Sequence, residues 1–153
     1  MKNKNSSIKL YNVLFPVWFL MLIPQLWLVI LPGNFIIDSL VLMISMYALK
    51  MTEKKQWYKQ HILKIFLFGM LSDIIGAAYL FLTAFILELG IMGDELYLTG
   101  PALLISAAMI FIFNYYFTFK KDALALRIKF SLIFAIVTAP YTFLIPSSWL
   151  YNF

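Results

Sequence analysis

Two aspartates, Asp38 and Asp73, lie inside stretches that otherwise have the composition of membrane-spanning helices. Asp73 is in the run FGMLSDIIGAAYL, residues 68–80. A carboxylate near the centre of a bilayer costs roughly 2.5–3.5 kcal/mol on insertion scales, so it is expected to be hydrogen-bonded, protonated or hydrated. Intramembrane acids of this kind serve in proton, cation or substrate sites, or in contacts between helices. The chemistry that this sequence offers is that of an acid placed in the membrane.

The role of Asp73 is open among three interpretations: a hydrogen-bonded packing residue, a proton, cation or substrate site, and a contact with a partner protein. We expect its hydrogen-bond partners to be hydroxyl groups on other spans, namely Ser45, Ser106, Ser131, Thr138 and Thr142. Asp38 either caps a helix start, contacts another helix or binds a ligand or ion. The candidate intramembrane polar site consists of Asp73, Asp38, Ser72, Ser45 and Asn114.

The sequence contains few of the residue types and motifs that catalysis commonly uses. The chain has one histidine and no cysteine, so a zinc site of the usual ligands cannot be assembled within it. His61 lies in a basic segment, where we expect it to be solvated. The sequence contains neither a phosphate-binding glycine loop nor an HExxH motif. We therefore assign no catalytic residue, no metal and no cofactor, and predict a protein that is not an enzyme.

The composition predicts an all-α integral membrane protein. Of the 153 residues, 63% are hydrophobic and 12% charged, with a mean hydropathy of +0.90, whereas soluble domains carry about 25% charged residues. We expect a single transmembrane domain over residues 1–153, folded as a compact bundle of about five helices. The predicted spans are 11–31, 34–50, 65–88, 97–118 and 129–149. LPGN, residues 31–34, is predicted to be a tight hairpin turn, and Pro140 to kink the last span.

The basic residues predict the orientation. All twelve fall in three blocks, which precede the first predicted span, follow the second and follow the fourth. Because cytoplasmic loops collect Lys and Arg, the N-terminus is predicted to be cytoplasmic and the C-terminus outside. The net charge of +5 is thus explained by topology, and nucleic acid is not an expected partner. Residues 51–64 also interleave basic and aromatic side chains, so recognition of anionic headgroups is an alternative reading of that loop.

Small residues mark the face of the third predicted span that packs against other helices. Gly69, Asp73, Gly76 and Ala77 recur at the spacing of one helical face. Helix contacts in membranes favour small residues, whereas lipid tails favour large apolar ones. We therefore predict that Gly69, Gly76 and Ala77 are helix-packing residues, and that Asp73 faces protein and not lipid.

A resemblance to a known family follows from residues 34–80. NFIIDSLVLMISMYALK and ILKIFLFGMLSDIIGAAYL resemble the central part of bacterial MreD proteins, in which an extracytoplasmic turn, an apolar span and a short basic loop precede a helix with a G-x-x-x-D-like pattern. Gly69, Asp73 and Gly76 occupy that pattern here. The resemblance implies a non-enzymatic membrane subunit of the cell-elongation or envelope-synthesis machinery. It also implies a fold similar to the helical substrate-binding subunits of vitamin transporters.

Two functions are therefore expected. The first is a multi-pass subunit or scaffold of a cell-envelope complex in a bacterial-type cytoplasmic (inner) membrane, whose partners are the lipid bilayer and either another membrane protein or further copies of this chain. The alternative is a transport subunit or carrier for a small solute, cation or proton, which uses Asp73 and possibly Asp38. Loss of flux in Asp73→Asn would distinguish the second from the first.

Overall fold

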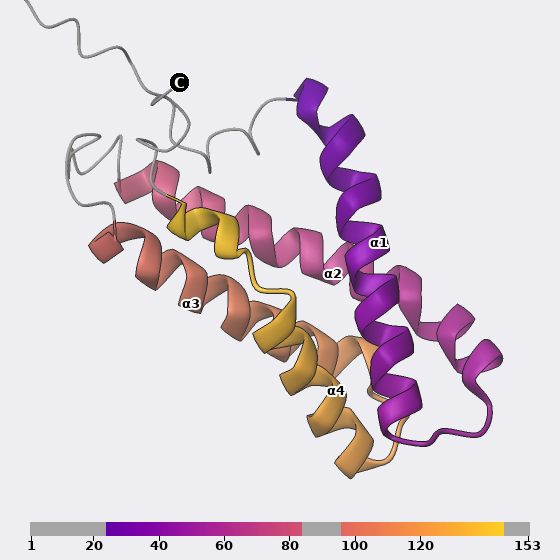
Figure 1. Ribbon diagram of the computed structural model, residues 1–153. Coiled ribbons are helices and arrows are strands. Elements are labelled where there is room, and N and C mark those ends of the chain that lie inside the picture. Colours follow the sequence, from indigo (N-terminus) through magenta and orange to yellow (C-terminus); the bar gives the residue numbers. More distant parts are fainter. Residues whose placement is uncertain (1–23, 84–95, 146–153) are drawn as a thin grey trace, which may run out of the picture.

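The computed structural model describes residues 24–83 and 96–145, and these are almost entirely helical (Figure 1). The elements are η2 (Pro24–Leu26), α1 (Trp27–Ala48), α2 (Lys54–Phe81), α3 (Leu96–Phe113), the π-helical turn η4 (Asn114–Thr118), α4 (Leu124–Val137) and η5 (Tyr141–Leu144). The prediction of an all-helical protein with long apolar helices is confirmed for this part of the chain.

Four helical stretches are long and apolar enough to cross a membrane, and the predicted count of five is wrong. They are Pro24–Ala48, Lys54–Phe81, Leu96–Thr118 and Leu124–Leu144. The predicted spans 11–31 and 34–50 are replaced, within the described residues, by one continuous helix from Pro24 to Ala48. Residues 11–23 and the predicted cytoplasmic N-terminus lie outside the described residues.

The error arose from reading Pro32 and Gly33 as a turn, whereas both lie inside α1. In water, a Pro-Gly pair ends a helix easily, because the freed backbone groups bind solvent. In hydrocarbon the groups of an open turn would stay unsatisfied, at several kcal/mol each, so a helix through the pair is favoured. Pro32 removes only one backbone donor from the helix.

Two connections between described helices contain basic residues, and both connections lie at the same end of the bundle (Figure 1). We call this the basic end and define it by residues 49–53, between α1 and α2, and residues 119–123, between α3 and α4. Lys50, Lys120 and Lys121 lie in these connections and are exposed. The arrangement agrees with the predicted grouping of these two loops on one side of the membrane.

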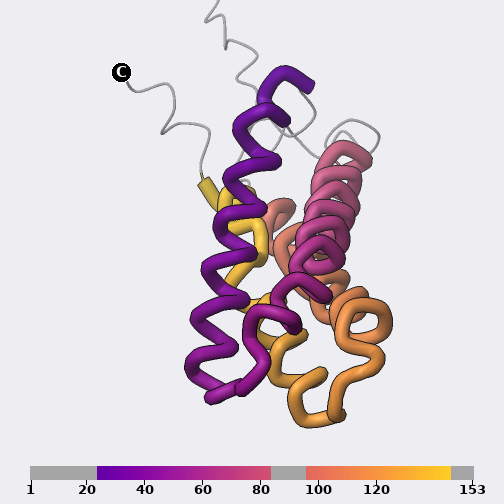
Figure 2. Tube along the Cα trace, turned by 90° about the vertical axis from the view of Figure 1, so that its right-hand side faces the viewer, coloured from indigo at the N-terminus to yellow at the C-terminus, as the bar shows by residue number. Residues whose placement is uncertain are grey.

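The helices pack around the pair formed by α2 and α3, which share the largest interface. α1 packs on α2 and α4, α4 packs on α3, and η5 covers the part of α3 furthest from the basic end. Figure 2 shows the same bundle from the side, with α1 running along its edge. The predicted compact bundle is thus present with four helices.

The core has two parts, and α1 contributes to only one of them. Near the basic end, residues of all four long helices are buried together: Leu42, Met46, Ile62, Ile65, Ile110, Phe119, Phe130, Phe134 and Ala135. At the other end the buried cluster is Ala77, Leu80, Leu98, Ala102 and Phe143, from α2, α3 and η5. All buried residues of α1 lie in its second half, from Asp38 onwards. The first half of α1 therefore stands away from the bundle, as Figure 1 shows.

The last span is interrupted close to Pro140, where a kink was predicted. α4 ends at Val137, residues 138–140 are not helical, and η5 begins at Tyr141. Tyr141 N donates to Ala139 O at 2.7 Å, which turns the chain sharply after the proline. Proline lacks the backbone donor that the helix would need at this point. Non-helical backbone at membrane depth is tolerated where it is buried in protein or lines a cavity.

Candidate intramembrane binding site

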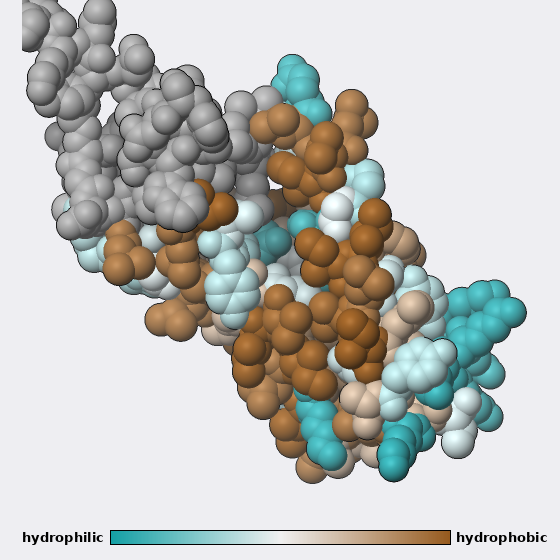
Figure 3. All heavy atoms as spheres, viewed as in Figure 1, coloured by the Kyte–Doolittle hydropathy of each residue, from teal (hydrophilic) through white to brown (hydrophobic). Residues whose placement is uncertain are grey.

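A cavity of about 450 Å³ opens where the first half of α1 leaves the bundle. α1 contributes Asn34 and Asp38 to its wall, α2 contributes Gly69 and Asp73, and the interrupted span contributes residues 137–142. Figure 3 shows hydrophilic atoms in a recess between α1 and the rest of the bundle, with hydrophobic atoms around it. The volume is within the range of about 300–1,000 Å³ that is usual for small-molecule sites.

The two intramembrane aspartates line this one cavity. Asp38 and Asp73 are only 6% and 9% exposed. Asp73 Oδ1 is buried and accepts no hydrogen bond from any described residue. A second, much smaller cavity of about 20 Å³ also borders Asp73 and Asn34, and this is enough for about one water molecule. Asp73 thus borders a large cavity and a small one, and its buried Oδ1 has no donor among the described residues.

Gly69 allows α1 and α2 to approach each other beside the acids. A Cβ atom built on Gly69 would lie 3.7 Å from Asp38 Oδ2, an ordinary van der Waals distance. An alanine therefore fits at this position, whereas a larger side chain would extend into the cavity that Gly69 lines. Gly69, which was predicted to be a packing residue, is also part of the wall of the cavity.

The expectation that hydroxyl groups on other spans bind Asp73 is wrong for its Oδ1 atom. Of the predicted partners, Ser106 Oγ donates to Ser72 O at 2.9 Å and Thr138 Oγ1 donates to Phe134 O, four residues earlier in its own helix, at 2.8 Å. Ser131 Oγ is buried without a partner among the described residues. A local bond like that of Thr138 is always within reach in a helix, and it competes with partners on other helices. The buried acid is left without a donor from the described chain.

The C-terminal end of α4 forms part of the cavity wall, and two of its last four carbonyl groups accept bonds from side chains: Phe134 O from Thr138 Oγ1 and Ile136 O from Tyr141 Oη. Val137 and Thr138, at the C-terminal end of α4, both line it. The last carbonyl groups of a helix have no partners within the helix and carry the negative end of the helix dipole. None of the described residues that line the cavity is Lys, Arg or His. Both acids, when ionised, and the helix end therefore favour a positive charge.

The other three candidate polar residues do not line the cavity. Ser72 is fully buried against α3, where Ser106 Oγ donates to Ser72 O at 2.9 Å. Ser45 is buried on α1, seven residues nearer the basic end than Asp38. Asn114 begins the π-helical turn, and its Nδ2 donates to Ile110 O at 3.0 Å. Of the five predicted site residues, the structure brings only the two aspartates together around a cavity.

Gly76 and Ala77 lie in contacts between helices. A Cβ on Gly76 would overlap Ser106 Oγ and would lie 3.1 Å from Ala102 O, so the backbones of α2 and α3 approach closely here. Ala77 is 1% exposed and belongs to the buried cluster furthest from the basic end. The small-residue face of α2 is thus used inside the bundle.

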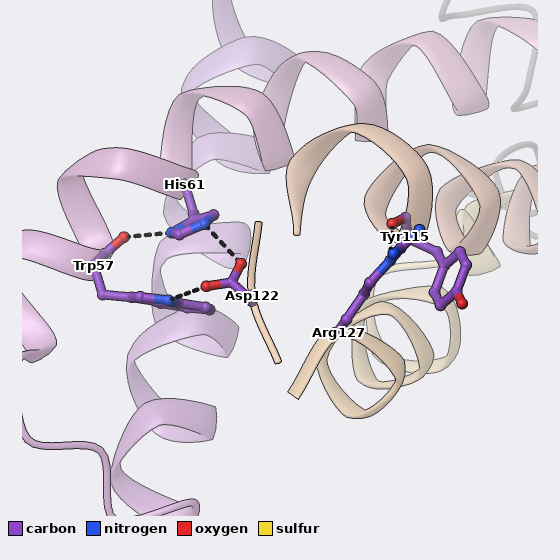
Figure 4. Close-up of polar contacts among 5 residues, drawn as sticks. All are labelled: Trp57, His61, Tyr115, Asp122 and Arg127. Carbon is purple, nitrogen blue, oxygen red and sulfur yellow. Dashed lines mark hydrogen bonds and ion pairs between the residues drawn. The ribbon is translucent and has the colours of Figure 1, made fainter. Parts of the chain in front are cut away.

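A cluster at the basic end was not foreseen from the sequence, and it corrects the expectation that His61 is solvated (Figure 4). His61 is 3% exposed. Its Nδ1 lies 2.8 Å from Trp57 O, and its Nε2 lies 3.1 Å from Asp122 Oδ2, at ion-pair distance. Trp57 Nε1 donates to Asp122 Oδ1 at 2.9 Å. Asp122 therefore links the start of α2 to the connection between α3 and α4.

Arg127 makes a second link at the basic end. Its Nε donates to Tyr115 O, and its guanidinium lies 3.7 Å from the centroid of the Tyr115 ring. Figure 4 shows both links in one view. Because Trp57 and Asp122 are separated by 65 positions in the sequence, only the folded chain could reveal their contact.

The chain was compared with protein families, curated proteins and solved structures, and none of the three comparisons found a match. The resemblance of residues 34–80 to MreD proteins stays a prediction from the sequence. The function must therefore be argued from the geometry of the cavity.

Proposed function

We propose that this small polytopic membrane protein binds a small cationic solute in the cavity between α1, α2 and the interrupted span, and that it acts as a transport subunit or carrier. One observation carries the proposal: Asp38 and Asp73, only 6% and 9% exposed, line one cavity of about 450 Å³, and Asp73 Oδ1 has no donor among the described residues. A buried acceptor of this kind needs a proton of its own or a donor beyond the described residues, since leaving it unsatisfied is costly.

The backbone around the acid supports the same reading. Membrane helices are normally continuous, because each broken hydrogen bond leaves polar groups in hydrocarbon. Here the last span is broken at residues 138–140, where it forms part of the cavity wall. Transporters use discontinuous helices of this type at their binding sites, where helix C-terminal ends and unwound carbonyl groups face cations.

The scaffold interpretation, which was favoured from the sequence, receives less support from the geometry. It rested on the resemblance of residues 34–80 to MreD proteins, which stays a prediction from the sequence. In the structure, Gly76 and Ala77 are used in contacts between α2 and its neighbours within the chain, and Gly69 faces Asp38. These residues therefore do not need a partner protein to account for them.

Flux into liposomes tests the proposal. Wild type and Asp73→Asn are reconstituted, and uptake of radioactive sodium and of radioactive methylammonium is measured against protein-free liposomes. We expect uptake of at least one cation by wild type and its loss in Asp73→Asn. Glu53→Gln is the matched control, because it removes an exposed acid at the basic end and leaves the cavity intact.

Gly69 provides a second pair of variants that leave both acids in place. Gly69→Leu fills part of the cavity and should abolish uptake, whereas Gly69→Ala places its Cβ at 3.7 Å from Asp38 Oδ2 and should retain it. Folding of each variant is checked by circular dichroism in detergent. Folded wild type that neither binds nor transports sodium, methylammonium or the larger phenethylammonium contradicts the proposal. Co-purification of a membrane partner that survives Asp73→Asn would then support the scaffold interpretation.

A further inference from the structure

The shape and lining of the cavity identify the class of cation more narrowly, provided that the proposed function holds. The cavity of about 450 Å³ is far larger than a single ion requires, since even a water molecule takes up only about 30 Å³ of liquid volume. It has space for an organic molecule with an apolar body. A ligand of that kind would displace several waters together.

The polar side chains of the cavity come from three elements: Asn34 and Asp38 from α1, Asp73 from α2, and Thr138, Tyr141 and Thr142 from the interrupted span. Asn34 lies one helical turn before Asp38 on α1, and both line the cavity that Asp73 borders from α2. The rest of the wall is largely apolar and includes Ile37, Met70 and Val137. A ligand that matches this wall has a charged polar head and an apolar remainder.

Asp73 Oδ1 has no donor among the described residues, and an ionised carboxylate is stabilised by a donor that also carries a positive charge. A primary or secondary ammonium group supplies both, and hydrogen bonds between ionised groups are about twice as strong as neutral ones. A quaternary ammonium ion supplies the charge but has no N–H group to donate. The helix C-terminal end at Val137 adds a favourable negative potential without competing for the N–H groups of the ligand.

A metal ion fits this set of ligands less well. Calcium takes six to eight oxygen ligands, and transition metals prefer His or Cys. Among residues 24–83 and 96–145, no group of three or more His, Cys, Asp and Glu side chains is placed to hold a metal. Two carboxylates in a roomy, largely apolar cavity leave most positions around a metal ion unfilled.

We infer that the ligand is a small primary or secondary organic ammonium ion, whose N–H groups bind Asp73 and Asp38 and whose apolar body lies against Ile37, Met70 and Val137. This inference rests on the proposed function, because it names the solute that the same cavity takes. It predicts selectivity by both charge and apolar size.

Calorimetric binding to the full chain in detergent tests the inference with defined probes. Phenethylammonium carries the charge and an apolar body, 2-phenylethanol has a similar body without the charge, and sodium and calcium ions carry charge without the body. We expect phenethylammonium to bind at least tenfold more tightly than 2-phenylethanol, and neither metal ion to compete with it at equal concentration. Asp73→Asn should weaken binding of phenethylammonium at least tenfold, while Glu53→Gln should leave it unchanged.

The outcomes separate the inference from the proposed function. Binding of sodium or calcium that depends on Asp73, without binding of phenethylammonium, overturns the organic ligand but keeps cation binding. Equal binding of phenethylammonium and 2-phenylethanol also overturns it, because the acids would then be irrelevant. If no cation binds to folded wild type, the cavity holds water only and both proposals fail. If Asp73→Asn does not fold, Gly69→Leu against Gly69→Ala decides in its place, with loss of binding expected only for leucine.

Discussion

Gly76→Ala tests the packing of α2 on α3 most directly. The added Cβ would overlap Ser106 Oγ, lie 2.9 Å from Phe143 Cε2 and lie 3.1 Å from Ala102 O. The hydroxyl and the ring can move a little, but the carbonyl belongs to the backbone of α3 and cannot move without shifting the helix. Overpacking of this kind usually costs about 1–3 kcal/mol. We expect Gly76→Ala to lower the free energy of unfolding by that amount relative to a matched control.

The control is Gly33→Ala, because a Cβ at Gly33 meets no atom within 4 Å. Both glycines lie inside helices, so both substitutions gain the same advantage in helix propensity, up to about 1 kcal/mol. The difference between the two variants therefore isolates the packing cost. Unfolding in mixed micelles by increasing amounts of sodium dodecyl sulfate, followed by circular dichroism, measures both.

A second substitution identifies the source of the cost. Ser106→Ala alone removes the bond from Ser106 Oγ to Ser72 O and should destabilise the protein, by about 0.6 kcal/mol if it is typical of membrane proteins. In the Gly76→Ala background the same change also removes the nearest clash, so it should cost less or even stabilise. If Gly76→Ala unfolds at the same detergent fraction as Gly33→Ala, the close approach of α2 and α3 is refuted.

The remaining stability predictions concern contacts near the basic end, measured by the same unfolding assay. Asp122→Ala leaves Trp57 Nε1 without its acceptor and should cost about 1–3 kcal/mol, whereas Lys121→Ala, at an exposed neighbouring position, should change little; equal stability of the two variants would show that Asp122 does not link the loops. Tyr58→Phe removes the 2.9 Å bond between the Tyr58 and Ser39 hydroxyls and should cost about 0.6 kcal/mol. A loss in Tyr58→Phe as large as that in Asp122→Ala would contradict this ranking.

The sequence predicted the class of the fold because that class depends on the amounts and lengths of apolar segments. Runs of roughly twenty apolar residues identify membrane helices with little regard to their details. The predicted number of spans was wrong because Pro32 and Gly33 were taken as a turn. Pro-Gly pairs favour turns in soluble proteins, where water binds the freed backbone groups, but the bilayer offers no such hydrogen-bond partners. The basic segment 51–64 was likewise read as a loop, but α2 begins within it at Lys54.

Only the two aspartates of the site could be predicted from the sequence, because an acid inside the membrane has the highest free-energy cost. A carboxylate in an apolar run is conspicuous, so Asp73 and Asp38 could be singled out from sequence alone. Their common cavity could not, because it depends on where α1 leaves the bundle and on which carbonyls the serine and threonine hydroxyls bind. For the part of the cavity wall that residues 137–142 form, Pro140 was the only local signal in the sequence. The links between Trp57, His61 and Asp122 had no local signal at all.

The break at residues 138–140 also constrains the order in which the chain assembles. A continuous helix can enter the bilayer alone, because it satisfies its own backbone before it meets a neighbour. The segment from Val137 to Tyr141 lacks that independence, and its exposed backbone groups are tolerated only beside α1, α2 and α3. We therefore expect the last span to reach its final position in the bilayer only after α1, α2 and α3 have associated. During synthesis, residues 137–141 would be the last of the described residues to become resistant to proteases.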